Sequence, residues 1–403
     1  QVVQWDKEGL EAVGLAKLDV LGLAALDLID AAARLVGDGR GGAFPLDAIP
    51  PDDAAVYGML ARAETLAVFQ FESPAQMALL PRLRPRRLDD LTAATALIRP
   101  GPVQGGMVPA FLARRCGEEP VRFLHPLLEP VLRETHGVLL YQESVLLAAI
   151  ALAGFSAGEA DELRRAMGSK RSAAKMAALE ERFLAGAAAK GVPEATAREV
   201  FAQIRAFSGY GFVKAHAASF ALLAYEAAWL KHHHPVAFWA ARLSALPGGG
   251  WPPAAYVWEA RRRGVRILRP DLDRSAWRPT IEADGRGRAV RLGLWFVRGL
   301  ADERGPGLVA ERARGGPYRD LADLCRRAHP RLTPTAIEAL ILAGACDDWG
   351  VARRDLLWAL PAAWRGATGL DLPVAVPALA PVSSLEILRG EEWATGIPLS
   401  THP

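Results

Sequence analysis

The sequence predicts a mainly α-helical protein of several domains, an α+β fold whose strands are few and short. Its 403 residues are 51% hydrophobic and 23% charged, enough for roughly two to four domains that each bury a core. Apolar residues recur at helical spacing along most of the chain. The alternation typical of strands is confined to a stretch after residue 264.

The first expected element is a short buried strand at residues 16–23, with Asp19 inside it or at its end. Helical spacing begins directly after it, at residues 23–36. Further helical segments follow between residues 52 and 258, separated by Pro and Gly residues that break helices. These segments are residues 75–83, 89–97, 141–153, 157–167, 173–189, 194–207 and 215–233.

The pattern changes after three consecutive glycines at residues 248–250. Residues 265–268, 279–282 and 289–292 alternate like strands, and Asp284-Gly285 is a turn signal between the last two. This predicts a small sheet or hairpin. Helical spacing returns at three segments, residues 308–313, 321–327 and 333–342. Residues 367–384 are rich in Pro and Ala, which is typical of a linker.

Charge and cysteine content narrow the class of protein only slightly. The net charge of +3 does not by itself indicate a polyanion as partner. Only seven of the 48 cationic residues are Lys, and the Arg side chain suits phosphate oxygens, although a GC-rich genome produces the same bias. The three cysteines lack zinc-site spacing and fit a reducing cytosol. No apolar run is long enough for a membrane span and no signal peptide is visible, so a cytoplasmic location is expected.

Two basic clusters are candidates for phosphate binding. Residues 163–171 (Leu-Arg-Arg-Ala-Met-Gly-Ser-Lys-Arg) place Arg164, Arg165 and Lys170 near a helix end, where they can hold a triphosphate or a nucleic-acid backbone. The alternative is a solvated basic end that complements the helix dipole. In residues 209–219, Lys214, His216 and Ser219 open a helix after a Gly-x-Gly turn, and helix N-termini attract anions. An aromatic-anchored loop that leads into a core helix explains this second cluster equally well.

Other patterns are better explained by structure than by chemistry. The run of three histidines at residues 232–234 fits a helix end, because consecutive side chains point in different directions. Asp271 and Asp273 resemble a two-metal pair but fit a loop of turn-forming residues. No nucleophile elbow of a hydrolase occurs. Residues 333–349 read as a helix-hairpin-helix that can bind a phosphate, or as an ordinary corner between two helices, and Gly299 marks a related turn.

Several short motifs, taken in order, resemble the alpha subunit of bacterial DNA polymerase III, the C-family polymerases. They are residues 17–23 (Lys-Leu-Asp-Val-Leu-Gly-Leu), 68–73 (Val-Phe-Gln-Phe-Glu-Ser), 98–102 (Ile-Arg-Pro-Gly-Pro), 140–143 (Leu-Tyr-Gln-Glu), 163–170 and 209–212 (Gly-Tyr-Gly-Phe). Matches at residues 4–7, 75–83, 102–108 and 216–223 are similar to the family's error-prone, translesion branch. The resemblance covers nearly the whole chain.

The resemblance implies a division into domains and a set of site residues. Residues 1–36 would be the last piece of the palm, 37–250 the fingers, 251–362 a clamp-binding domain with helix-hairpin-helix elements, and 363–403 a linker toward an OB-type domain outside this sequence. Asp19 would be the third catalytic carboxylate and a metal ligand, the other two lying upstream of residue 1. Residues expected to face the nucleotide or DNA phosphates are Lys17, Arg99, Arg164, Arg165, Lys170, Lys214, His216 and Ser219.

The implied activity is template-directed transfer of nucleotides from dNTPs to a primer 3′ end with two Mg²⁺ ions, in error-prone synthesis across DNA damage. This sequence alone should be inactive, because one carboxylate cannot assemble a two-metal site. Expected partners are primer-template DNA and a sliding clamp, with accessory mutagenesis proteins as further candidates, in the nucleoid. Gly299-Leu300-Ala301 departs from the family's hairpin, and residues 370–373 replace a clamp-binding motif. The competing hypothesis is a non-catalytic helical DNA-binding or scaffold module.

Overall fold

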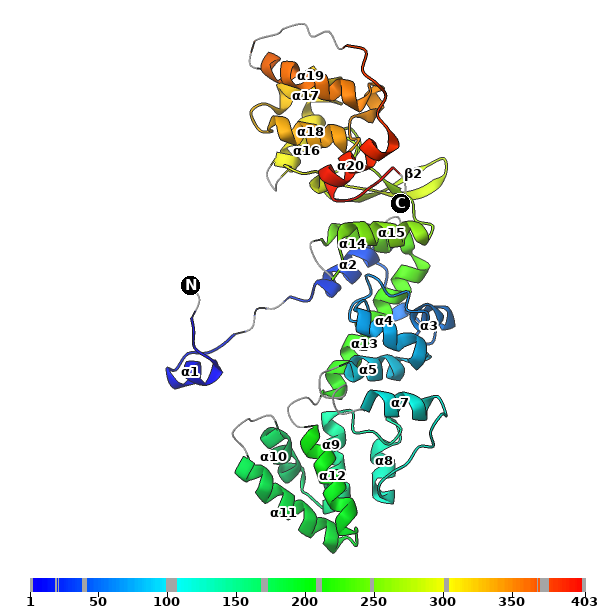
Figure 1. Cartoon of the computed structure of the whole chain (residues 1–403), viewed down its shortest axis with the longest axis vertical. Helices are drawn as coiled ribbons and strands as arrows, with labels where there is room; N and C mark the ends of the chain where they lie inside the picture. The colour runs from blue at the N-terminus through cyan, green and yellow to red at the C-terminus, as the bar shows by residue number, and fades with distance from the viewer. Residues whose placement is uncertain are drawn as a thin grey trace.

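The helices are arranged in three tiers stacked along one long axis, and α1 (Lys7–Ala12) stands apart from them (Figure 1). The computed structural model describes residues 3–18, 20, 22–37, 42–98, 107–167, 173–207, 212–246, 250–300, 304–367, 369 and 377–400. Three separate clusters of buried hydrophobic side chains correspond to the three tiers. The predicted fold class, mainly α with a small β element and several cored units, is confirmed. Among the described residues no helix is long and apolar enough to cross a membrane.

The central tier is organised around one long helix, α13 (Lys214–His233). Its other helices are α2 (Ala24–Gly37), α3 (Ala54–Ala61), α4 (Pro74–Leu83), α5 (Leu88–Leu97), α14 (Pro235–Ser244) and α15 (Pro253–Arg262), with the 3-10 turn η1 (Leu46–Ala48). α13 packs against α2, α3, α5 and α14. Ala94 of α5 and Ala224 and Ala228 of α13 are fully buried, and such small side chains let the two helices pack closely.

The lower tier contains most of the basic segments noted in the sequence. Its helices are α8 (Glu129–Leu132), α9 (Gln142–Ala153), α10 (Ala157–Met167), α11 (Ala173–Ala189) and α12 (Glu194–Ala206), with η2 (Pro126–Leu128), while α7 (Met107–Arg115) joins it to the central tier. Gly154 ends α9 in the left-handed conformation, with φ of +64°. A Cβ atom on Gly186 of α11 would lie 2.0 Å from the carbonyl oxygen of Ala153, so the close approach of α9 and α11 requires glycine there.

The upper tier begins with the predicted small sheet. Strands β1 (Ile267–Leu268), β2 (Thr280–Asp284) and β3 (Gly287–Arg291) pair in the order β1-β3-β2, with β1 parallel and β2 antiparallel to β3. In the described part of the chain the sheet is followed by η3 (Leu294–Phe296), α16 (Arg304–Gly315), α17 (Leu321–Ala328), α18 (Pro334–Leu342), η4 (Asp347–Trp349), α19 (Arg353–Gly366) and α20 (Ser384–Thr395), where η3 and η4 are 3-10 turns. The predicted hairpin around Asp284 is thus confirmed.

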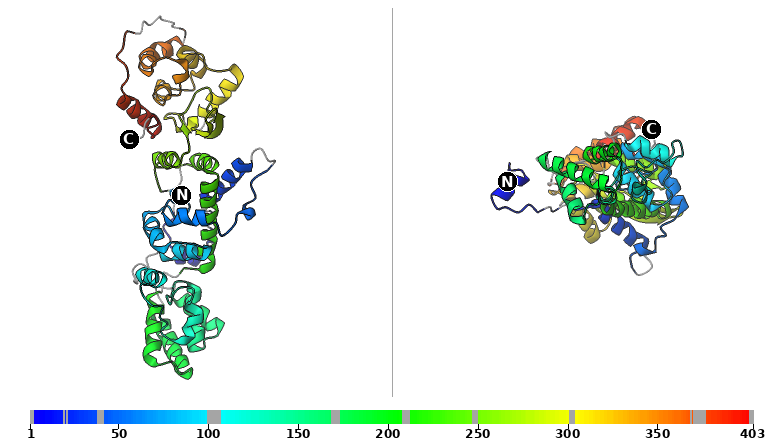
Figure 2. Two further views of the ribbon diagram at one scale, coloured as in Figure 1. Left: turned by 90° about the vertical axis from the view of Figure 1, so that its right-hand side faces the viewer. Right: turned by 90° about the horizontal axis from the view of Figure 1, so that it is seen from below.

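The predicted buried strand at residues 16–23 is wrong. Leu18 is 83% exposed and Val20 95% exposed, and none of the described residues of this segment forms a strand. A strand is buried by the neighbours it pairs with, and the sheet of the described chain, residues 267–291, does not include this segment. Figure 1 and the right-hand view of Figure 2 show the N-terminal residues away from the three tiers.

The predicted linker at residues 363–403 is wrong for part of its length. Residues up to Gly366 belong to α19, and α20 packs against α18. α20 begins at a capping box, in which the side chain of Ser383 accepts from the amide of Glu386 and the carboxylate of Glu386 accepts from the amide of Ser383. This cap, which a Pro/Ala-rich composition conceals, starts a helix.

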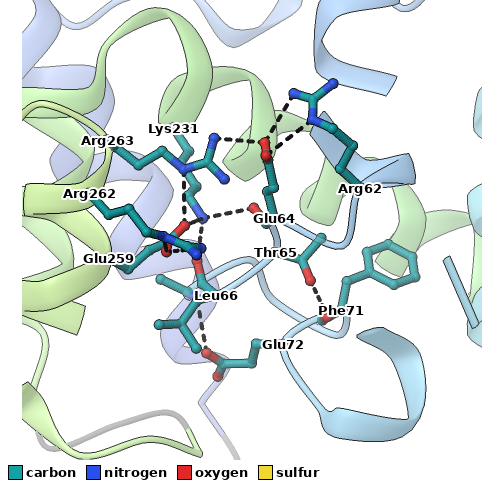
Figure 3. A network of polar contacts seen from close by, with 11 residues as sticks. Arg62, Glu64, Thr65, Leu66, Phe71, Glu72, Lys231, Glu259, Arg262 and Arg263 are labelled. Carbon is teal, nitrogen blue, oxygen red and sulfur yellow. Dashed lines mark hydrogen bonds and ion pairs between the residues drawn. The ribbon is translucent and has the colours of Figure 1, made fainter. Parts of the chain in front are cut away.

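A buried ion pair joins α13 to α15 in the central tier (Figure 3). The ammonium of Lys231, 1% exposed, lies 3.5 Å from the carboxylate of Glu259. It also donates hydrogen bonds to the carbonyl oxygens of Glu64 and Leu66, at 2.9 and 2.8 Å. Burial lowers the pKa of Lys231 to about 8, although Glu259 favours the charged form. The Lys231 ammonium therefore connects the backbone of residues 64–66 to α13, which carries Lys231, and to α15, which carries Glu259.

Candidate nucleotide and DNA interface

Three motifs that are far apart in the sequence meet between the central and lower tiers. Tyr141, just before α9, forms a parallel β-bridge with Phe212, and the amide of Gln142 donates to the carbonyl of Phe212 at 3.0 Å. Phe69, from the segment 68–73, packs edge-on against Phe220 of α13 with ring centroids 5.1 Å apart. The motifs around residues 69, 141 and 212 therefore form one continuous surface.

Lys214 lies at the centre of this surface, where α13 begins. Its backbone amide donates to both carboxylate oxygens of Glu143, at 3.0 Å each, across 71 residues of sequence. Its ammonium pairs with Glu134 at 2.7 Å and lies 5.8 Å from the centroid of the Tyr141 ring. The helix start that was predicted to attract an anion thus already holds a carboxylate of the chain itself.

His216 and Ser219 lie on the first turns of α13 and are both exposed. The imidazole of His216 lies between two rings, tilted against Phe220 with centroids 4.1 Å apart and edge-on to Phe212 with centroids 5.1 Å apart. The hydroxyl of Ser219 donates to the carbonyl of Ala215, one turn back, at 3.0 Å. His216 is therefore held in orientation by aromatic contacts, as the aromatic-anchored loop predicts, and anion binding at this helix start stays a prediction.

Arg164 and Arg165 lie in the last turn of α10 and share one carboxylate. Their guanidinium groups are 2.8 and 2.6 Å from the two oxygens of Asp161, and Arg165 is 73% exposed. The hydrogen bond from Arg164, with the one from Arg165, lowers the pKa of Asp161, although desolvation acts in the opposite direction. The two cations are thus oriented on the surface by a carboxylate that a phosphate would have to compete with.

Three predicted site residues, Asp19, Arg99 and Lys170, lie outside the described residues. Lys17 is described and exposed. Arg164 and Arg165 are connected to Lys214 through two helices: α10, which carries the arginines, packs against α9, and Glu143 of α9 accepts from the Lys214 amide. Across the described part of the chain, no three His, Cys, Asp or Glu side chains come together as a metal site.

A groove of about 570 Å³ lies beside the loop that carries Phe69. Leu23 and Ala24, at the start of α2, form one wall, and Phe69 and Gln70 form another. Arg242 is among the other lining residues. Leu23, the last residue of the 17–23 motif, therefore lies beside the 68–73 motif.

The turn between α18 and α19 has the helix-hairpin-helix shape predicted for residues 333–349. Gly344 has φ of +77°, which favours glycine. The guanidinium of Arg353 donates to the carbonyl of Leu342 at 3.0 Å and pairs with Asp347 at 2.8 Å and Glu391 at 3.4 Å. A cluster of the chain's own ionised groups therefore fills the inner side of this turn.

The run of three histidines and the Asp271–Asp273 pair have the structural roles expected from the sequence, a helix end and a turn. The His run ends α13 at His233, and His233 pairs with Asp53 at 2.7 Å. Asp271 accepts from the amides of Asp273 and Arg274, as a turn-forming residue does.

Sequence reasoning missed the acidic partners of the site. Glu143, Glu134 and Asp161 each hold a predicted basic residue or its backbone. Asp161 has a local signal, because it precedes Arg164 and Arg165 by three and four residues on one helix face. Glu134 and Glu143 are 80 and 71 residues from Lys214, and no local pattern connects them to it.

Comparison with known proteins agrees with this geometry. The bacterial DNA polymerase III alpha subunit finger domain matches residues 25–191, and a helix-hairpin-helix motif matches residues 264–356. The finger-domain match starts at residue 25 and so includes α2, which the predicted boundary at residue 36 left in the palm.

Relatives named error-prone DNA polymerase align with the entire chain. Those from Mycobacterium bovis, Nocardia farcinica and Anaeromyxobacter dehalogenans are 45%, 44% and 42% identical to it. The chain spans only 37%, 36% and 37% of their respective lengths. The names of these relatives agree with the branch that the short motifs favoured. Residues 25–191 of the chain thus match the finger domain of the bacterial DNA polymerase III alpha subunit, and the chain is similar along its whole length to proteins named error-prone DNA polymerase.

Proposed function

We propose that this chain is the fingers-bearing part of an error-prone DNA-directed DNA polymerase, which adds nucleotides from dNTPs to a primer 3′ end. The observation that carries the proposal is the meeting of three family motifs at one surface, where Lys214 and His216 are held by Glu143 and by aromatic rings. Because these groups are already held in place, little free energy is spent on reorganising them when a charged substrate binds.

The roles of the basic residues follow from their chemistry. Lys214, Arg164 and Arg165 offer cationic donors to the triphosphate of a dNTP or to the backbone of primer-template DNA. His216 offers an exposed imidazole at the same surface as Lys214. Arg99 and Lys170 belong to the same proposal through the motifs that contain them, as does Lys17 beside Asp19.

DNA polymerases generally use divalent metal ions, and Asp19 is the residue of this chain that we propose as a Mg²⁺ ligand. The described residues gather no carboxylate cluster that fits two ions. The other ligands would have to come from another part of the polymerase, so we assign no reaction step to the metal here. A sliding clamp and accessory mutagenesis proteins are proposed as partners on the family resemblance alone.

Replacing Arg164 or Arg165 by Ala in the full-length polymerase should raise the apparent KM for all four dNTPs alike, because phosphates carry no base identity. The expected loss is about 1.5 to 3 kcal/mol per charge-assisted contact. Single-nucleotide incorporation kinetics with each dNTP measures it. An effect confined to one base would contradict triphosphate binding.

Two variants control this experiment. Asp161→Asn removes the carboxylate that competes for both cations, so the KM should fall or stay constant. Arg198→Ala removes a comparable exposed cation of α12, paired with Glu194 one turn away at 2.7 Å, and should change nothing. If all three arginine variants behave alike, Arg164 and Arg165 only form a solvated helix end.

The 403-residue chain by itself should bind duplex DNA weakly and without sequence preference, and should not extend a primer at any Mg²⁺ concentration. The helix-hairpin-helix region and the basic clusters support binding, while a single carboxylate, Asp19, cannot hold two metal ions. Affinity should fall steeply with salt as counterions are released. Titration of labelled duplex DNA at two salt concentrations checks this, and salt-independent binding would contradict it.

A further inference from the structure

The loop at residues 62–72 has an unusual backbone conformation. Ala63, Ala67 and Gln70 have φ of +55°, +66° and +68°, in the left-handed region that residues with a Cβ atom seldom occupy. Each such residue costs free energy and persists only where its surroundings hold it. The same loop carries Phe69 to the candidate interface and lines the groove beside it.

Polar side chains bind the backbone of the loop through hydrogen bonds, as Figure 3 shows. The ammonium of Lys231 donates to the carbonyl oxygens of Glu64 and Leu66, on either side of Thr65. The carboxylate of Glu72 accepts from the amide of Ala67 at 3.0 Å. The hydroxyl of Thr65 donates to the carbonyl of Phe71 at 2.6 Å, which closes the loop on itself.

The other ends of this network lie in two helices of the central tier, α13 and α15. Glu259 of α15 lies 3.5 Å from Lys231, and Arg263, one turn later, pairs with both Glu259 and Glu64, at 3.0 and 2.7 Å. Because Lys231 is 1% exposed and Glu259 6% exposed, water cannot replace these contacts without opening the core.

A row of aromatic rings leads from the loop to the interface. Phe69 contacts Phe220, Phe220 contacts His216, and His216 contacts Phe212, with ring centroids 5.1, 4.1 and 5.1 Å apart. A shift of the loop therefore changes the support of the His216 imidazole. Phe69 is the contact through which the loop reaches this row.

We propose that Lys231 is a positioning residue for nucleotide binding: by holding the carbonyls of Glu64 and Leu66 it fixes the 62–72 loop, and through Phe69 and Phe220 it fixes His216. Lys231 itself touches no substrate, since it is buried on the far side of the loop. The inference rests on the proposed polymerase function for its link to the nucleotide. The hold on the loop does not depend on that function.

The test must separate positioning from simple stabilisation. Lys231→Met alone leaves the Glu259 carboxylate buried with one partner fewer, which destabilises the fold for unrelated reasons. The double variant Lys231→Met/Glu259→Met replaces both buried charges by apolar side chains of similar length, and such replacements commonly preserve stability. It still removes the donor that holds the two carbonyls.

In the full-length polymerase, the double variant should melt near the wild-type temperature. Amide hydrogen exchange within residues 62–72 should accelerate about 10-fold or more, with other segments unchanged. The KM for all dNTPs should rise about 10-fold while kcat changes less, since misplaced binding groups weaken ground-state and transition-state binding alike. Arg62→Ala is the matched control, because it removes only the exposed ion pair to Glu64, and it should leave the KM unchanged.

Two results would overturn the inference. Unchanged exchange in residues 62–72 of the double variant would show that Lys231 does not hold the loop, whatever the activity. Faster exchange with an unchanged KM would show that the loop does not position the nucleotide site. A wild-type protein that incorporates no nucleotide would instead refute the proposed function, and the exchange measurement distinguishes that failure from the first.

Discussion

Replacing Asp19 by Asn in the full-length polymerase should abolish nucleotide incorporation while primer-template affinity stays within a few-fold. A metal-binding carboxylate stabilises charge that develops in the transition state, so its loss affects the rate more than ground-state binding. Several kcal/mol of lost stabilisation corresponds to a rate lower by on the order of 10³-fold or more. Single-turnover primer extension and a DNA-binding titration measure the two quantities separately.

Asp27→Asn is the matched control for this prediction. Asp27 lies eight residues later, exposed in the first turn of α2, and the same charge is removed without a proposed metal contact. It should incorporate nucleotides at the wild-type rate. Near-normal primer extension by Asp19→Asn would refute the assignment of Asp19, and the non-catalytic DNA-binding hypothesis would then gain support.

Replacing Glu391 by Ala should destabilise the upper tier by about 3 to 5 kcal/mol, because two backbone amides lose their charged acceptor. Arg353 also loses one carboxylate partner and keeps another, Asp347. Glu391 is fully buried on α20 and accepts from the amides of Leu399 and Ser400 at 2.8 and 2.7 Å. It also lies 3.4 Å from Arg353 of α19 and accepts from the hydroxyl of Ser400. Thermal unfolding and proteolysis of residues 384–400 measure the loss.

The neighbouring residue provides the control. Glu392 has the same charge and is exposed on the same helix, so Glu392→Ala should leave both measurements unchanged. If Glu391→Ala also leaves the melting temperature and the proteolysis of α20 unchanged, the docking of α20 does not depend on this ion pair, and the helix is held by its apolar contacts alone.

Helices whose boundaries depend on local signals were predicted well. The predictions for residues 157–167 and 173–189 coincide with α10 and α11. Their apolar spacing and the glycines and prolines beside them are properties of adjacent residues, which a single sequence displays. The α18 helix also starts as expected, since Thr333 caps it and Pro334 follows.

Elements that depend on distant partners were predicted poorly. Residues 16–23 have the composition of a buried strand, yet Leu18 and Val20 are exposed, because burial depends on which strands lie beside a segment. The C-terminal segment has the composition of a linker, yet α20 docks through Glu391 onto Arg353, 38 residues away. In both cases the composition of a segment does not reveal which distant residues it contacts, and those contacts decide whether it is buried.

The sequence by itself determined the fold class and the resemblance to C-family polymerases, because periodicity, motif order and residue type are written in the chain. The basic residues of the candidate interface remain a prediction from the same motifs. Only the tertiary structure decided how those residues are held. It placed Glu143 on the amide of Lys214, and the Lys231 ammonium behind a loop 165 residues away. Hydrogen bonds and ion pairs act over about 3 to 4 Å whatever the separation along the chain, so only packing of the folded helices determines which groups meet.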